Sequence, residues 1–235
     1  MKKLAIFVEG QTEQIFVQKL VVEVIGQNAV NIESIKVTGG RRIKKQWIRI
    51  NAFQPDPHRE YYVQIIDCAG DDRVKSEIRD NYDTLVNAGY SAIVGIRDVY
   101  PKFTFAEIPK LRENLKYGMK TKPFEAIFVL GVMEIEAWFL SEHTHFRKLD
   151  PALTLDAINT TCGFDPSVDD MQLRPHPSAD LDEIYHIAHL HYAKNKDTVQ
   201  RTVDVLNYAS LYAEIPKKLP DLKRVVDVLD SFLSA

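Results

Sequence analysis

The feature that most constrains the fold is a series of short, uninterrupted apolar runs, each followed by a segment with helical spacing. Leu4–Val8 is the first of these runs, and Tyr61–Ile66 and Ala92–Ile96 come later. Runs of this length without polar alternation are typical of strands that are buried on both faces of a parallel sheet. We therefore expect an α/β fold in which helices flank a mostly parallel sheet.

The segment after the first run shows the expected helix signals. Thr12 is placed to cap a helix, and Glu13 would lie in its first turn, where a negative charge is favourable. Apolar residues then recur at helical spacing until Gly26, namely Ile15, Phe16, Leu20, Val21 and Val24. A glycine at that position is a common helix end, so we expect one helix between the first two strands.

The pattern changes after about residue 145. Residues 1–145 carry the alternation of strand-like and helix-like segments, whereas residues 146–235 are mainly helical in pattern. We expect an α/β domain over the first range and a helical C-terminal subdomain, packed on it, over the second. The apolar residues from Ala179 onward suit helix packing, so this segment is expected to serve solubility or partner docking and not metal binding.

Composition excludes several classes of protein. The formal net charge is −3, so no overall attraction to nucleic acid or to an anionic membrane is expected. The two cysteines are far apart and form no disulfide framework. The apolar run after Met1 is too short for a signal peptide, and no segment approaches the length of a membrane span. We therefore expect a cytoplasmic protein with no membrane partner.

Acidic residues follow three of the predicted strands. Glu9 follows the first, Asp98 follows Ala92–Ile96, and Glu134 and Glu136 follow Phe124–Val132. Ligand sites in open parallel sheets form outside the carboxyl ends of the strands. Clustered carboxylates without histidine or thiolate neighbours suit a hard cation such as Mg²⁺ or Mn²⁺. The alternative is that these acids are solvated loop residues.

Four short motifs support the functional interpretation. They are Val8-Glu9-Gly10-Gln11-Thr12-Glu13, Arg97-Asp98-Val99-Tyr100-Pro101, Glu136-Ala137-Trp138-Phe139-Leu140 and Tyr192-Ala193-Lys194. In this order they resemble the motifs of TOPRIM domains, in particular a small bacterial TOPRIM-like branch related to OLD-type nucleases and often linked to phage defence. The resemblance implies a TOPRIM-like α/β domain over residues 1–145.

The resemblance also implies roles for single residues. Glu9 would be a catalytic residue and metal ligand, Asp98 the principal Mg²⁺ ligand, and Glu13 a ligand of a second metal. The chain departs from the usual D-x-D motif, because Tyr100 replaces the second aspartate. Glu134 or Glu136 would have to supply the missing carboxylate. A helix over this segment would point the two glutamates apart, in which case Glu136 is expected to dominate.

Basic residues supply candidate nucleic-acid contacts. Arg41, Arg42, Lys44 and Lys45 lie in a basic loop with Trp47, a mixture that could hold phosphates and stack a base. Lys194 is a further candidate for phosphate binding. The alternative is that these residues form an ordinary solvated charged surface.

A zinc site is not expected from the histidines. His186 and His189 share a helix face, but His191 should point elsewhere, and no second ligand pair accompanies them.

Two hypotheses follow from the sequence. The first is a TOPRIM-like, Mg²⁺-dependent nuclease that hydrolyses phosphodiesters of DNA or RNA, with Glu9 and Asp98 side by side at one edge of the sheet. The second is a non-enzymatic or conditionally active effector that docks on a partner ATPase. Homo-oligomerisation is compatible with either one.

Overall fold

A central sheet organises the chain. The computed structural model describes residues 1–40, 43–51, 53–70 and 72–234. These residues form one six-stranded sheet in the order β3-β2-β4-β1-β5-β6. The strands are β1 (Lys2–Val8), β2 (Val30–Thr38), β3 (Gln46–Arg49), β4 (Tyr61–Asp67), β5 (Tyr90–Asp98) and β6 (Ile127–Gly131). Strand β1 pairs in parallel with β4 and β5, β2 pairs in parallel with β4, and the short β3 pairs antiparallel with β2. The expected mostly parallel α/β fold is confirmed.

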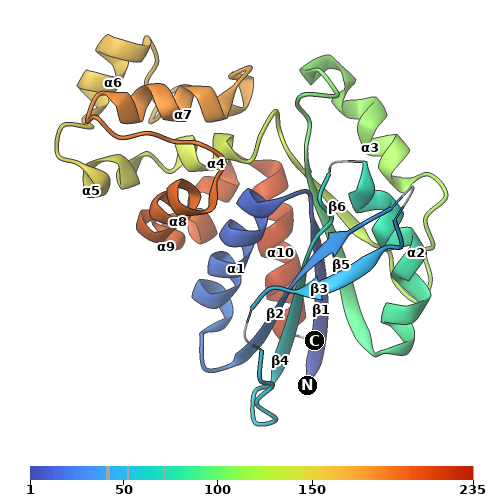
Figure 1. Ribbon diagram of the computed structural model, residues 1–235. Coiled ribbons are helices and arrows are strands. Elements are labelled where there is room, and N and C mark those ends of the chain that lie inside the picture. The colour runs from blue at the N-terminus through green and yellow to red at the C-terminus, as the bar shows by residue number, and fades with distance from the viewer. Residues whose placement is uncertain (41–42, 52, 71, 235) are drawn as a thin grey trace. The chain divides into compact units, whose positions relative to one another are not determined.

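Helices cover both faces of this sheet. Figure 1 shows α1 (Gln11–Ile25) on one face and α2 (Arg73–Asn87) and α3 (Ile108–Lys116) on the other. This arrangement follows from right-handed crossovers, because the step from β1 to β2 and the step from β4 to β5 run in opposite directions across the sheet. The remaining α-helices are α4 (Glu136–Ser141), α5 (Phe146–Leu149), α6 (Leu155–Cys162), α7 (Pro177–His186), α8 (Lys196–Val205), α9 (Tyr208–Ala213) and α10 (Pro220–Ser234). Among the described residues, none of the helices has the length and apolar character of a membrane span.

The apolar runs of the sequence form the core of the sheet. The side chains of Leu4–Val8 are at most 1% exposed, as expected for a strand with neighbours on both sides and helices on both faces. Val8 lies in register with Asp67 of β4 and with Ile96 of β5. The carboxyl ends of β1, β4 and β5 therefore fall at the same edge of the sheet.

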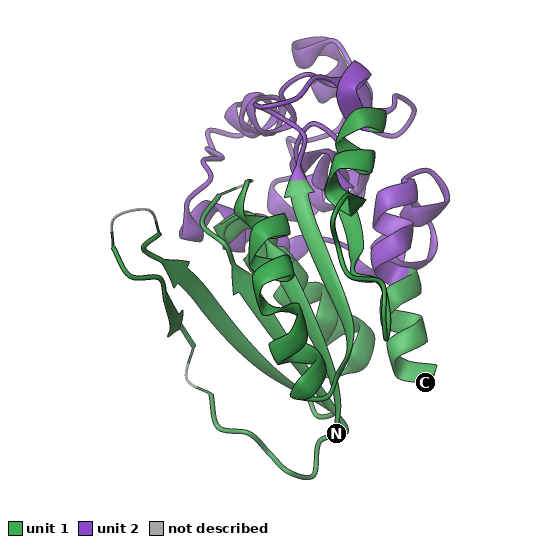
Figure 2. Cartoon of the chain, turned by 90° about the vertical axis from the view of Figure 1, so that its right-hand side faces the viewer, with its two compact units in different colours: residues 1–97, 109–129, 227–235 green, residues 98–108, 130–226 purple. Residues whose placement is uncertain are grey.

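The chain divides into two compact units, neither of which is one continuous segment. Residues 1–97, 109–129 and 227–235 form unit 1, which holds most of the sheet, and residues 98–108 and 130–226 form unit 2 (Figure 2). The sequence places its domain boundary near residue 145 instead. The chain passes from unit 1 to unit 2 at the ends of β5 and β6, which is where the acidic motifs begin.

Two local details differ from the sequence expectations. Helix α1 begins at Gln11 with Gly10 as its N-cap, so Thr12 lies inside the first turn and is not the cap. Strand β3 lies within the segment that was expected to be a basic loop. Its four residues add an antiparallel edge to β2, a pairing that the charged sequence did not reveal.

Candidate metal centre in unit 2

Three carboxylates of unit 2 converge on the ammonium group of Lys194. Its Nζ lies 2.9 Å from Glu134 Oε1, 3.2 Å from Glu136 Oε2 and 3.7 Å from Asp98 Oδ2. The Glu136 side chain is fully buried, and those of Glu134 and Asp98 are almost so. The structure therefore brings Asp98, Glu134 and Glu136 together with Lys194, and we call these four residues the carboxylate cluster.

The backbone explains why both glutamates reach the same lysine. Strand β6 ends at Gly131 and α4 begins at Glu136, so Glu134 lies in the turn between them. Met133 adopts a left-handed conformation with a φ of 59°, which is uncommon for a residue other than glycine. The segment is thus neither a continued strand nor a helix. The expectation that a helix would point the two glutamates apart is wrong, and only their relative importance for metal binding stays a prediction.

Each carboxylate has one oxygen held by a fixed donor while another faces Lys194. The backbone N–H of Ile135 donates to Asp98 Oδ1 at 2.8 Å. The backbone N–H and hydroxyl of Ser178 donate to Glu134 at 2.8 and 3.0 Å. The Tyr192 hydroxyl donates to Glu136 Oε1 at 2.8 Å. These bonds orient the carboxylates toward one point.

Close packing beneath Asp98 depends on Gly131. A Cβ atom at this position would lie 2.3 Å from Asp98 Oδ1 and 2.9 Å from the backbone nitrogen of Ile135. Both distances are shorter than side-chain atoms tolerate, so a glycine is required for the hydrogen bond between these two groups. Sequence pattern alone does not single out Gly131, since a glycine at the end of a strand usually signals only a turn.

Burial and charge shift the pKa values of the cluster in different directions. Burial raises the pKa of Glu136, and the neighbouring charge of Glu134 adds to this effect, so the value lies above the ordinary one despite Lys194. Burial also acts on Glu134, but Lys194 and the Ser178 bonds outweigh it and lower its pKa. The pKa of Lys194 is raised, since the charges of the three acids exceed the effect of its burial. Lys194 is therefore held in its charged form.

Segments beyond residue 179 take part in this cluster. Tyr192 and Lys194 both contact Glu136, although the sequence assigned the tail to packing and docking. Lys194 was expected to bind phosphate, and the structure gives it acidic partners. Ser178 was missed altogether, because a serine after Pro177 is also an ordinary residue for a helix start.

The first motif lies in unit 1, where its residues shape a helix start. The backbone N–H of Gly10 donates to Glu13 Oε2 at 3.0 Å, so Glu13 caps α1. The backbone oxygen of Glu9 accepts a bond from the N–H of Gly70 at 2.9 Å. Asp67, which the sequence did not select, is buried at the end of β4 and lies 3.7 Å from Lys36. The metal-binding roles of Glu9 and Glu13, and the pairing of Glu9 with Asp98, stay predictions.

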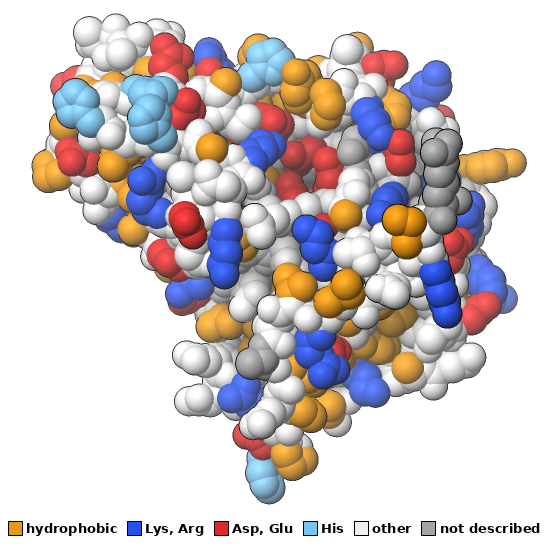
Figure 3. All heavy atoms as spheres, viewed as in Figure 1, with side chains coloured by type: hydrophobic (Ala, Val, Ile, Leu, Met, Phe, Trp, Pro, Cys, Tyr) orange, Lys and Arg blue, Asp and Glu red, His pale blue; other side chains and the backbone are white. Residues whose placement is uncertain are grey.

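The basic loop is partly engaged in contacts within unit 1. Arg41 and Arg42 lie outside the described residues, and Lys44 is exposed. Lys45 pairs with Glu77 at 2.8 Å, and the ring of Trp47 packs edge-on against Phe7 with the centroids 6.1 Å apart. On the face shown in Figure 3, lysine and arginine side chains are interspersed with acidic and apolar ones among the described residues. Nucleic-acid binding by the loop stays a prediction.

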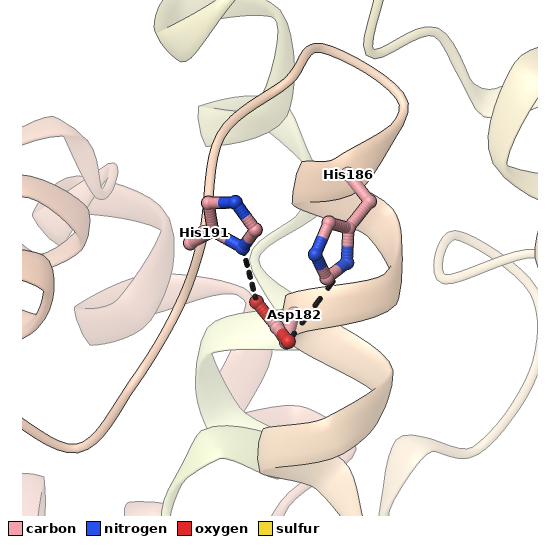
Figure 4. Close-up of side chains that lie close together, drawn as sticks. All are labelled: Asp182, His186 and His191. Atoms are coloured by element: carbon pink, nitrogen blue, oxygen red, sulfur yellow. Dashed lines mark ion pairs between the residues drawn. The ribbon is translucent and has the colours of Figure 1, made fainter.

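The histidines of the C-terminal region are arranged differently from the sequence expectation. His191 does not point away from His186: the two rings lie 4.4 Å apart, on either side of Asp182 (Figure 4). The chain reverses after α7, and this reversal returns His191 to the helix. Helical periodicity alone could not reveal it.

Comparisons with known proteins add no further assignment: no family model matches the chain, and neither a curated protein nor a solved structure shows significant similarity to it.

Proposed function

We propose that the chain is a TOPRIM-like phosphodiesterase that uses Mg²⁺ or Mn²⁺ to hydrolyse DNA or RNA, in a branch linked to phage defence. The carboxylate cluster is the metal centre of this proposal. Asp98, Glu134 and Glu136 would hold the ion, because carboxylate oxygens are the ligands that hard cations prefer. The four motifs of the sequence supply the link to nucleic-acid hydrolysis.

One observation carries the proposal. Glu136 Oε2 is buried, and its contact with Lys194 Nζ at 3.2 Å is an ion pair without hydrogen-bond geometry, while it faces the same point as Glu134 Oε1. A buried carboxylate oxygen without a hydrogen bond is costly, so such groups usually coordinate a metal or serve a reaction. Two glutamates also share the charge of Lys194, which leaves room for further positive charge. The donor set therefore fits a divalent cation.

The protein groups have separate roles in such a reaction. When bound, the metal would act as a Lewis acid on a phosphate oxygen and lower the pKa of a water molecule. Ser178, Tyr192 and the N–H of Ile135 keep the carboxylates oriented, so that little rearrangement is needed. The Lys194 ammonium would contact a non-bridging phosphate oxygen. Glu9 is proposed as a further acid from the sequence motif alone.

A second candidate function is favoured by the position of Lys194. Its ammonium lies at the point on which the carboxylate oxygens converge, where it can replace a metal ion as their counter-charge. A cluster neutralised in this way supports an effector that is silent, or that becomes active only when a partner such as an ATPase draws the lysine away. Both candidates use the same residues.

Cleavage by the isolated chain separates the two functions. Supercoiled plasmid and tRNA are incubated with the wild type and with Asp98→Asn, Glu136→Gln, Glu9→Gln and Asp204→Asn, each with Mn²⁺, Mg²⁺ or EDTA. Asp204 is an exposed residue of α8 and serves as the matched control. We expect metal-dependent cleavage by the wild type and Asp204→Asn, and a loss of about 100-fold in Asp98→Asn and Glu136→Gln.

Other outcomes assign the function differently. Retained cleavage in Asp98→Asn with an unchanged thermal melt would remove the cluster from the mechanism, and the same result for Glu9→Gln would remove Glu9 alone. Mn²⁺ binding without cleavage of either substrate would support the conditionally active effector. A wild type that neither binds Mn²⁺ nor cleaves would refute the proposed metal centre.

A further inference from the structure

Unit 2 contains a second group of potential metal ligands. It differs from the carboxylate cluster because two of its three ligands are histidines. Asp182, His186 and His191 each offer one ligand atom, and these atoms all lie within 4.8 Å of one another. His186 Nδ1 is 3.8 Å from Asp182 Oδ2, and His191 Nδ1 is 3.9 Å from Asp182 Oδ1. Figure 4 shows the two imidazole rings above the carboxylate, which lies between them.

Local structure builds this group in two steps. Asp182 and His186 are four residues apart on α7, which places them on one face of the helix. The helix then ends in a tight reversal: His189 adopts a left-handed conformation, with a φ of 57°, and the N–H of Leu190 donates to the carbonyl of Tyr185. These features are typical of a helix C-terminus, and they return the chain toward α7.

Two further bonds hold the returning segment in place. The backbone N–H of Tyr192 donates to Asp182 Oδ1 at 2.7 Å, which fixes both the carboxylate and the residue after His191. Arg201 of α8 donates to the backbone carbonyl of His191. The backbone of all three potential ligands is therefore held, while the His186 and His191 side chains are exposed to solvent. A bond from the backbone to a ligating carboxylate is the kind of outer contact that orients metal ligands.

The ligand types select a class of metal. Two imidazole nitrogens and one carboxylate oxygen suit Zn²⁺, Co²⁺, Ni²⁺ or Cu²⁺ better than Mg²⁺. Ligand bonds of about 2.0–2.2 Å require the three atoms to approach one another more closely than they do here. Rotation of the rings can achieve this, since the His186 and His191 side chains are 49% and 71% exposed. Water would complete the coordination on the exposed side.

We propose that Asp182, His186 and His191 bind one transition-metal ion of the zinc class. The ion would fasten the returning segment, residues 190–195, to α7. This segment carries Tyr192 and Lys194, which both contact the carboxylate cluster. The bound ion would thus stabilise the segment that supplies Lys194, whether or not the cluster is catalytic.

Titration of the full chain with Co²⁺, followed by its visible absorption and by calorimetry, tests the proposal. We expect one Co²⁺ per chain at this site, competition by Zn²⁺, and a lower melting temperature after chelation. His186→Ala and His191→Ala should weaken binding by at least about tenfold, equivalent to 1.4 kcal/mol. His189→Asn is the matched control, because asparagine tolerates the left-handed conformation of this exposed residue.

The remaining outcomes separate this site from the carboxylate cluster. Glu136→Gln should leave Co²⁺ binding at the histidines unchanged even if it abolishes Mn²⁺ binding. No Co²⁺ binding by the wild type, equal loss in His189→Asn, or full binding by the His186→Ala/His191→Ala double variant would each overturn the proposal. Loss of circular dichroism signal in a histidine variant would direct the test to His186→Gln and His191→Gln, judged by the same criteria.

Discussion

Each unit contains a site with buried glutamate, and the two sites differ in how many donors and positive charges surround the carboxylates. In unit 1, the Glu33 carboxylate accepts bonds from Arg49, Tyr62 and Gln64, so one negative charge faces a full set of donors. In unit 2, Glu134 and Glu136 face one ammonium, and Glu136 Oε2 accepts no hydrogen bond. The first group is a satisfied ion pair, and the second has the capacity to take up another cation.

The pKa values express the same difference. Burial acts to raise the pKa of Glu33, but the bonds from Tyr62, Gln64 and Arg49 outweigh it and lower the value. Burial and the charge of Glu134 instead leave the pKa of Glu136 raised. A satisfied ion pair chiefly supports the fold, whereas perturbed groups with unmet bonding capacity are typical of functional sites. Four changes to the chain test this contrast.

The largest effect is expected from Lys194→Met, which removes the ammonium from the cluster. Glu134 and Glu136 then lose their counter-charge while they stay buried, so the free energy of unfolding should fall by about 2–3 kcal/mol. This value is below the range of about 3–5 kcal/mol for a broken buried pair, because the Lys194 side chain is 39% exposed and solvent screens its charge. Urea denaturation measures the loss, and Mn²⁺ should restore part of it. Lys196→Met, on the exposed start of α8, is the control; an equal loss there would contradict the assigned role.

Gly131→Ala tests the packing beneath Asp98. The added methyl group would overlap Asp98 Oδ1, so we expect a loss of about 2 kcal/mol in the free energy of unfolding and weaker metal binding. At Gly10 the corresponding atom would meet its nearest neighbour at 3.5 Å, an ordinary contact, so Gly10→Ala should cost less. Thermal melts of both variants decide the question. A larger loss for Gly10→Ala would show that the first motif, and not the cluster, has the tighter packing.

The third change compares the two glutamates. We expect Glu136→Gln to weaken Mn²⁺ binding about tenfold more than Glu134→Gln, equivalent to 1.4 kcal/mol. The reason is that Glu134 Oε1, which faces Lys194, also accepts a hydrogen bond from the Ser178 hydroxyl. Glu136 Oε2, which faces Lys194 as well, accepts no hydrogen bond. Calorimetric titration of both variants measures the difference. Equal losses would mean that the ion uses both glutamates alike, and a larger loss for Glu134→Gln would reverse the assignment.

The smallest effect is expected from Glu33→Gln. The folded pKa of Glu33 is below its ordinary value of 4.5, so its contribution is present above that pH and is lost as the pH falls through the folded value. Because Arg49 is 54% exposed, we expect a loss of only about 1 kcal/mol at neutral pH. The variant should show a shallower fall in stability than the wild type on acidification, and the same stabilisation by Mn²⁺ as the wild type, because its carboxylate cluster is unchanged. A weaker stabilisation by Mn²⁺ than in the wild type would contradict the contrast, because it would give Glu33 a part in metal binding. Glu23→Gln, in an exposed pair, is the control.

Much of the fold could be predicted from local pattern, and part of the site could be as well. The apolar runs identified β1, β4 and β5, since burial on both faces leaves no polar alternation. Asp98, Glu134 and Glu136 were selected because acids follow buried strands. The contacts of Ser178, Tyr192 and Gly131 could not be assigned, because the partners are far away in the sequence. Ser178 contacts Glu134, 44 positions away, Tyr192 contacts Glu136, 56 positions away, and Gly131 lies against Asp98, which is 33 positions away (131 − 98).

Local residue patterns were enough to predict the α/β class, the mostly parallel sheet and the acids that follow its strands. These follow from periodicity and from the rule that strand ends collect functional groups, both of which are local properties. Three features were visible only in the folded chain: Lys194 contacts the three carboxylates, both glutamates reach it, and His191 returns to Asp182 and His186. Each of these depends on a chain reversal or a close backbone approach, at Met133, Gly131 and His189. Such turns are set by packing and hydrogen bonds between distant segments, which the order of residue types does not specify.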